Sequence, residues 1–282
     1  MFRQVLEVPL KAGRQLAWNP NGRLLALSTE RQAMILDTHT SHLQAMPFKV
    51  LGPWSPDGSL VLADPDLTHT LVLRWPDLEL VAKLPLQRWH WTPNQGLVAL
   101  APQGIVCCNA PFDDLQLLET GEDPWQLIRP VEEKLIGIRW RSSLSRNELV
   151  AWQSGFPLEV ANRPDLSALR FQEWAWTETN DAWVSLETDP QQHLRAWSHP
   201  LGQPQATVRR EKVAGGLVHA GAALLWLTPT EVRGWARSSQ EHYSYPLPSD
   251  ATAFCRAWHE PSRRLAVSGK ESLEILEVNP YG

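Results

Sequence analysis

Residues that could do chemistry are present in this chain, but they lack the spacing that common reactions need. Asp64 and Asp66 could offer two carboxylates to a cation, yet no further ligand follows at the spacing of a calcium-binding loop. His39 and His42 lie near a predicted turn, and a metal site there would need two more ligands from elsewhere. Ser268-Gly269-Lys270 lacks the upstream glycine of a phosphate-binding loop. Local sequence therefore predicts no catalytic residue, no metal site and no cofactor.

The elements that would position such residues follow from an internal repeat. A tryptophan, a turn rich in Pro, Asn, Asp and Gly, and a short apolar run recur along the chain. Six copies cover residues 17–28, 53–64, 90–101, 139–152, 175–186 and 257–268, and a degenerate seventh copy, with Val218 in the Trp position, covers 216–236. A period near 40 residues with four strand-like runs is typical of propeller blades. The repeat therefore predicts an all-β protein.

The best-preserved copies resemble the WD40 and TolB-like β-propeller superfamily. They read Trp54-Ser55-Pro56-Asp57-Gly58 followed by Leu60–Ala63, and Trp18-Asn19-Pro20-Asn21-Gly22. The resemblance implies a single closed seven-bladed β-propeller over residues 1–282. The blades are expected near 10–47, 48–84, 85–119, 134–171, 172–209, 210–248 and 249–282 plus 2–8. No Gly-His or Trp-Asp pair of typical WD40 blades is present, so the hydrogen-bond network of those pairs should be missing.

The chain ends predict how the last blade is completed. The seventh copy supplies three strands, Thr252–Trp258, Arg264–Ser268 and Glu271–Val278, where its siblings supply four. Phe2–Val8 alternates apolar and polar residues upstream of the first copy. We expect this segment to be the outer strand of the last blade, because the pairing would remove unpaired strand edges.

Two features are candidates for partner binding. Segments entering the predicted first strands carry five cations, Arg14, Lys49, Arg88, Lys134 and Lys212, which could form a positive ring that attracts an acidic ligand. Ordinary solvated loop charge is the alternative. The stretch 120–134 fits no strand of the repeat, and we interpret it as an inserted loop. It is either a plain surface loop or a partner-binding arm built around Trp125.

Composition narrows the class of partner. The chain has 282 residues, a net charge of -5 and a pI near 6.0, which argue against nucleic-acid and anionic-membrane partners. No stretch approaches 18 apolar residues. Three cysteines, two of them adjacent at 107 and 108, do not form a disulfide framework, and we expect a cytoplasmic, tryptophan-rich protein.

These observations favour a non-catalytic protein-interaction scaffold, or an adaptor subunit of a larger complex. Its partner would be a protein or peptide, an acidic one if the cation ring binds it. An enzyme or a small-ligand- or metal-binding propeller of the hydrolase, lyase or lactonase type is the alternative, because propeller sites assemble in the central channel without a local motif. His90, Arg139, Asp64 and Asp66 could contribute to such a site.

Overall fold

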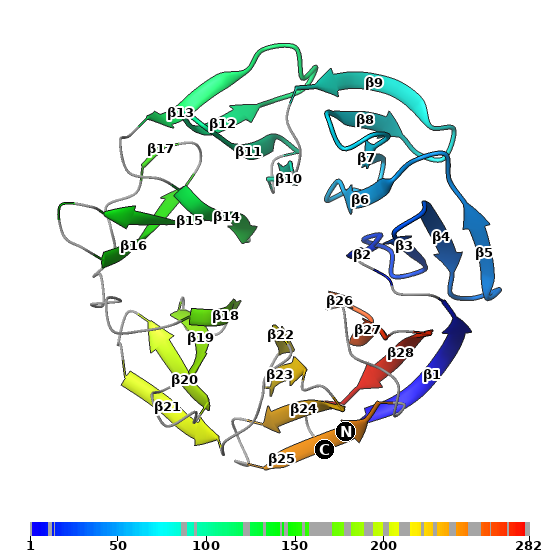
Figure 1. Cartoon of the computed structure of the whole chain (residues 1–282), viewed down its shortest axis with the longest axis vertical. Helices are drawn as coiled ribbons and strands as arrows, with labels where there is room; N and C mark the ends of the chain where they lie inside the picture. The colour runs from blue at the N-terminus through cyan, green and yellow to red at the C-terminus, as the bar shows by residue number, and fades with distance from the viewer. Residues whose placement is uncertain are drawn as a thin grey trace. The chain divides into compact units, whose positions relative to one another are not determined.

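The computed structural model describes most of the strands and their shorter connections. Its described residues are 2–10, 13, 15–85, 89–92, 95–120, 125–131, 134–141, 143, 146–153, 156–157, 171–177, 182–188, 194–199, 203–208, 215–220, 223–227, 230–236, 241–247, 255–259, 261–269 and 271–279. In this part of the chain the strands form seven antiparallel sheets of four strands each (Figure 1). No helix among the described residues is long and apolar enough to cross a membrane.

The chain divides into two compact units. The first comprises Met1–Trp18, Gly22–Ala45 and Leu169–Gly282. Its four sheets, each listed in strand order, are β2 (Gln15–Trp18), β3 (Leu24–Ser28), β4 (Ala33–Asp37) and β5 (His42–Ala45); β18 (Phe171–Thr177), β19 (Ala182–Thr188), β20 (Leu194–His199) and β21 (Gln203–Val208); β22 (Gly215–Ala220), β23 (Ala223–Leu227), β24 (Glu231–Ala236) and β25 (His242–Pro246); and β26 (Cys255–His259), β27 (Arg264–Ser268), β28 (Ser272–Val278) and β1 (Phe2–Pro9).

The second unit comprises Asn19–Asn21 and Met46–Ala168. It holds three sheets: β6 (Val50–Trp54), β7 (Leu60–Asp64), β8 (Thr70–Arg74) and β9 (Glu79–Leu84); β10 (His90–Trp91), β11 (Leu97–Ala101), β12 (Gly104–Cys108) and β13 (Gln116–Thr120); and β14 (Trp125–Val131), β15 (Lys134–Arg141), β16 (Arg146–Gln153) and β17 (Phe156–Pro157). We name each sheet below by its β2, β6, β10, β14, β18, β22 or β26 strand.

The second strand of each well-described sheet forms its core. β3, β7, β11 and β27 each contain an apolar triplet whose residues are at most 2% exposed. A continuous apolar run of this kind suits a strand that is covered on both faces. Two of the covering clusters lie in the first unit, where the β26 sheet packs against the β2 sheet on one face and against the β22 sheet on the other.

The repeated tryptophans join neighbouring sheets in a regular way. The indole Nε1 of Trp18 donates a hydrogen bond to the carbonyl oxygen of Ala257 at 3.1 Å. Trp91 Nε1 donates to the carbonyl oxygen of Pro53, also at 3.1 Å. Each acceptor directly precedes the repeat tryptophan of the previous sheet, Trp258 or Trp54. The residue spacing of the repeat therefore sets the spacing of the contacts between sheets.

The repeated turns fit against the same neighbours. Gly22 and Gly58 have φ angles of 69° and 74°, in the left-handed region that favours glycine. A Cβ atom on Gly22 would lie 2.5 Å from Cε1 of His259, and one on Gly58 would lie 3.2 Å from Nδ2 of Asn19. His259 and Asn19 each follow a repeat tryptophan, so glycine is needed both for the turn and for the close approach.

The N-terminal segment is the fourth strand of the β26 sheet, as the sequence predicts. β1 runs antiparallel to β28, with register pairs from Phe2 and Val278 to Pro9 and Ser272 (Figure 1). A register shift between Gln4 and Leu6 changes the side-chain alternation. As a result Phe2 packs against the cluster shared with the β22 sheet, while Leu6 and Val8 pack against the cluster shared with the β2 sheet.

The interpretation of residues 120–134 as an inserted loop is wrong. Trp125–Val131 is β14, the first strand of its sheet, and it pairs with β15 from Trp125 and Arg139 to Val131 and Lys134. The sheet thus begins near 125 rather than 134, and Trp140 lies on its second strand. Pro130 argues against a strand in sequence terms, but a proline is tolerated on an edge strand, and β14 is one.

Candidate partner-binding surface

The predicted cation ring is described at one side chain. Lys49 is exposed just before β6, and its backbone N–H donates to the carbonyl oxygen of Asp64 at 2.9 Å. Arg14, Arg88 and Lys212 lie outside the described residues. Lys134 begins β15, of which only the backbone is described. It lies at the β14–β15 hairpin, so it occupies the end of its sheet opposite to the one at which the first strand enters. The expectation that it precedes a first strand is therefore wrong.

The end of the β6 sheet that carries Lys49 also carries the connection between β7 and β8. Asp64, at the end of β7, is 9% exposed and accepts a hydrogen bond from Thr70 Oγ1 at 2.6 Å. Burial raises the pKa of Asp64. The buried Asp64 carboxyl group therefore links the end of β7 to the start of β8.

Asp66 has the opposite environment two residues later. It is exposed, and its Oδ1 accepts hydrogen bonds from Thr68 Oγ1 at 2.7 Å and from the Thr68 N–H at 3.0 Å. These bonds lower the pKa of Asp66, which keeps it ionised. His69 Nδ1 lies 3.2 Å from the same oxygen. Asp64 thus binds Thr70, whereas Asp66 binds Thr68. The described residues hold no group of three or more His, Cys, Asp or Glu side chains suited to a metal ion.

Leu67 stands at the tip of this connection. Its φ angle is 64°, which is unusual for a bulky residue, and 48% of it is exposed. The neighbouring Asp66–Thr68 hydrogen bonds hold the turn that places it there. A non-glycine residue in this region is a reason to look for function.

Two cations flank this leucine. Lys49 precedes β6, and the exposed Lys83 lies near the end of β9, close enough to contribute to lowering the pKa of Asp66. Because β6 begins where β7 and β9 end, the three side chains share one end of the sheet. We call Lys49, Asp66, Leu67 and Lys83 the Leu67 surface. From the sequence, Lys49 is a predicted partner-binding residue, and Asp66 is a candidate for a cation site or an enzyme site. An apolar residue between Asp and Thr in a polar connection was the available signal for Leu67.

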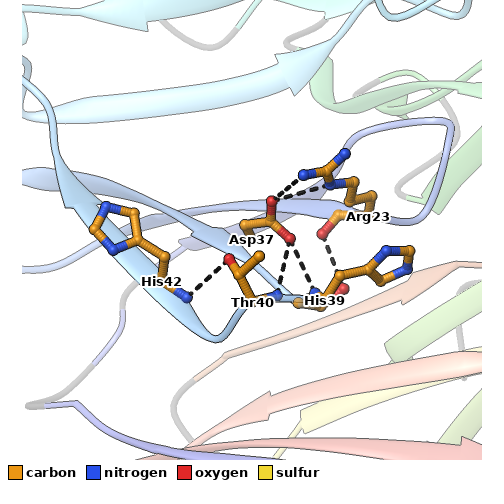
Figure 2. Close-up of polar contacts among 6 residues, drawn as sticks. Arg23, Asp37, His39, Thr40 and His42 are labelled. Atoms are coloured by element: carbon orange, nitrogen blue, oxygen red, sulfur yellow. Dashed lines mark hydrogen bonds and ion pairs between the residues drawn. The ribbon is translucent and has the colours of Figure 1, made fainter.

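In the β2 sheet, side-chain hydrogen bonds hold the hairpin between β4 and β5, at the end of the sheet opposite to the one at which β2 enters. Arg23 binds Asp37 through Nε at 2.9 Å and Nη2 at 2.6 Å, while Asp37 Oδ1 accepts the backbone N–H groups of His39 and Thr40 (Figure 2). The Arg23 hydrogen bond lowers the pKa of Asp37 to about 2. The imidazole rings of His39 and His42 point away from each other (Figure 2). The two histidines are therefore not assembled as a metal site.

The other candidate site is a small cavity on the outer strands of the β22 sheet. Its volume is about 160 Å³, and Arg233, Gly234, His242, Tyr243 and Ser244 line it. Arg233 Nε binds Glu231 at 2.9 Å, and the Tyr243 hydroxyl donates to Glu241. The guanidinium thus binds a carboxylate of its own strand, and the phenol binds the carboxylate just before β25, so the cavity offers no cation that is not already paired with a carboxylate.

The residues considered for an enzyme site fall on different elements. His90 begins β10, and Arg139 lies on β15, where only the backbone is described. Asp64 and Asp66 belong to the β7–β8 connection and take part in its hydrogen bonds. Among these four positions the structure describes no shared site.

Known proteins resemble this chain in fold but not in sequence. No protein-family model and no curated protein sequence matches the chain. Solved structures do match. The β-propeller domain of Cps50 (Swd1) from Myceliophteria thermophila has a TM-score of 0.72 at 12% identity, and the match covers 99% of this chain and 100% of that one. The chain has the fold of a WD40 β-propeller. The C-terminal WD40 domain of Sif2 matches with a TM-score of 0.66 at 14% identity, over 95% of this chain and 81% of that one.

A chain of the mitotic checkpoint complex gives a TM-score of 0.69 at 13% identity, over 98% of this chain and 94% of that one. At these identities the likeness concerns the fold alone. The WD40-type fold that the sequence resemblance implies is thus confirmed, and the function has to be argued from the surface.

Proposed function

We propose that this chain is a closed seven-bladed WD40-type propeller that binds a protein or peptide partner as a scaffold within a larger complex. Seven four-stranded sheets in chain order, with β1 completing the last of them, support the ring. A match to a propeller domain over 100% of that domain's length supports it too. The mitotic checkpoint complex is by its name an assembly, which supports the scaffold role.

The Leu67 surface is the observation that carries the binding proposal. A half-exposed leucine is held at the tip of a hydrogen-bonded turn, beside two exposed cations. Such a turn loses little conformational freedom on binding, so burial of the leucine contributes directly to affinity. Covering its remaining exposed area is worth roughly 1 kcal/mol or somewhat more. The complementary partner has an apolar pocket with carboxylates on its rim, which would meet Lys49 and Lys83.

The other predicted cations add to this basic surface in the proposal. Arg14, Arg88 and Lys212 precede the first strands of their sheets in sequence, as Lys49 does, and we propose that they extend the basic character of this face. Lys134 is not among them because it lies at a hairpin at the opposite end of its sheet. Attraction between such exposed charges and an acidic partner weakens with salt, since charges more than about 10 Å apart are screened at 0.1 M.

Affinity purification of the endogenous complex, followed by binding measurements with the identified partner, tests the proposal. The Leu67→Gly variant suits the left-handed backbone at that position. It should weaken binding by about five- to thirtyfold, the equivalent of roughly 1 to 2 kcal/mol. Leu80, which is 58% exposed on β9 of the same sheet, provides the matched control Leu80→Ala. Equal affinity of the Leu67→Gly variant and the unmodified chain would refute a role for this surface.

A further inference from the structure

β1 and β28 place two glutamates directly opposite each other. Glu7 is the register partner of Glu274 in the antiparallel ladder. Like charges at directly opposed positions destabilise a strand pair. Another position of the same ladder is complementary, since Arg3 forms an ion pair with Glu277. Glu7 and Glu274 thus form a like-charged pair in a ladder that elsewhere holds an ion pair.

Glu274 is also buried, with 2% of its surface exposed. It lies on the face of β28 that carries Leu276 and Val278, both members of the apolar cluster shared with the β22 sheet. A charged carboxylate in such a place is costly unless donors compensate it. The hydroxyl of Tyr245, from β25, is one donor that reaches it. Burial raises the pKa of Glu274 despite this hydrogen bond, and the charge of Glu7 adds to the shift.

Glu274 has neighbours on four strands besides its own. β27 presents Val267 at the register position beside it, and Arg256 of β26 is the next position in that row. β1 presents the exposed Glu7, which accepts a hydrogen bond from Gln4 Nε2 at 3.2 Å. β25 presents Tyr245. Glu7 is therefore the acidic neighbour of Glu274 on the strand that completes the sheet.

Tyr245 couples this site to the end of β1. Its ring packs against Phe2 with 6.2 Å between the ring centroids. Burial and the negative charge of Glu274 raise the pKa of Tyr245 to about 12, so the phenol keeps its proton through the physiological range. The phenol thus stays a donor whatever the state of the carboxyl group, which leaves Glu274 as the buried group here that changes charge.

We propose that Glu274 is a proton-controlled switch for the attachment of the N-terminal strand. When its carboxyl group is protonated, the repulsion from Glu7 disappears and β1 is held firmly against β28. When it is ionised, two carboxylates oppose each other and β1 detaches more readily. Detachment uncovers the edge of β28 together with the apolar side chains of Phe2, Leu6 and Val8. An open strand edge of this kind can pair with another strand.

The direction of the pH effect follows from proton linkage. The attached state holds the proton of Glu274 more tightly than a detached state would, because burial and the charge of Glu7 raise the pKa of Glu274 while β1 is in place. Attachment is therefore strongest at acidic pH and weakens as the pH rises through the raised pKa, after which it is constant. Because one proton is involved, the opening constant rises at most about tenfold per pH unit within that window.

Hydrogen exchange of the full chain, read by mass spectrometry on peptides covering residues 2–9 and corrected for intrinsic rates, tests the switch between pH 4.5 and 8.5. Protection of this segment should fall as the pH rises. In the Glu274→Gln variant, which keeps an acceptor for Tyr245 but carries no charge, protection should stay high and independent of pH. Glu277→Gln, on the exposed side of the same strand, is the matched control and should keep the pH dependence of the unmodified chain.

A second variant keeps the test decisive if Glu274→Gln folds poorly. Glu7 is exposed, so Glu7→Gln should fold normally. Removing the charge of Glu7 takes away one of the causes that raise the pKa of Glu274, while burial remains. The loss of protection should therefore end at a lower pH than in the unmodified chain, and its total size should be smaller. Protection that is constant with pH in the unmodified chain overturns the proposal, and so does a Glu7→Gln profile that is identical to it.

Discussion

Trp18 reaches out of its own sheet to bind the backbone next to Trp258, its counterpart in the neighbouring sheet, through the 3.1 Å hydrogen bond from Nε1 to the carbonyl oxygen of Ala257. The bond joins the β2 sheet to the β26 sheet, which contains the N-terminal strand. Trp18 also lies over the ring of His259, with 5.8 Å between the centroids. The repeat tryptophan therefore serves as a connector between sheets as well as a core residue.

Replacing Trp18 or Trp91 should lower the free energy of unfolding by more than the loss of buried apolar area alone would. Trp18→Phe and Trp91→Phe remove the indole N–H and leave a carbonyl oxygen without that donor. We expect each to lower the free energy of unfolding by about 1 to 3 kcal/mol, the range for an unsatisfied buried polar group. Urea denaturation measures the effect. Trp75→Phe, at a half-buried tryptophan outside the repeat position, should cost clearly less, and equal losses at all three positions would contradict the connector role.

The two turn glycines should differ in their tolerance of a methyl group. Both have a positive φ, so alanine costs about 1 kcal/mol at either position. At Gly22 the added Cβ also meets the His259 ring at 2.5 Å, whereas at Gly58 it meets the Asn19 amide at 3.2 Å. Gly22→Ala should therefore be the more destabilising substitution. Denaturation midpoints of the two variants give the order, and the reverse order would show that the His259 ring moves aside freely.

Loss of the N-terminal strand should expose the last sheet. Deletion of residues 1–9 removes the pairing partner of β28 and the apolar side chains that β1 adds to two clusters. We expect a large fall in melting temperature and aggregation through the open edge. Calorimetry and light scattering check both. A melting temperature within about 2 °C of the full chain, a shift worth about 1 kcal/mol at this size, would show that β1 is dispensable.

Asp37 should give a pH dependence opposite to that of Glu274. Its pKa in the folded chain is about 2, below the ordinary value of 3.8, mainly because Arg23 donates to it. The stabilisation is complete above the ordinary value and is lost as the pH falls through the folded value. Asp37→Asn should therefore lessen the loss of stability between about pH 4 and pH 2. Thermal unfolding over that range tests this, and a loss of stability in the Asp37→Asn variant as large as that in the unmodified chain would contradict it.

The sequence by itself determined the local structure of this protein. Trp18, Trp54 and Trp91 recur at the period of one sheet, and the turns after Trp18 and Trp54 carry the glycines that their φ angles require. The alternation in Phe2–Val8 identified a strand at the N-terminus. These signals are local because strand periodicity and turn conformation depend on residues near each other in the chain.

Tertiary structure decided which side chains are covered and which are presented. Glu274 and Glu277 lie on one strand, yet the β22 sheet helps to bury the first while the second pairs with Arg3 at the surface. Asp64 is buried whereas Asp66, two residues later, is exposed. Leu67 is exposed because the hydrogen bonds between Asp66 and Thr68 fix the turn. Trp125 begins a strand despite Pro130, since an edge position leaves that proline without a cost. Burial and strand order depend on neighbouring sheets, which periodicity within one segment does not encode.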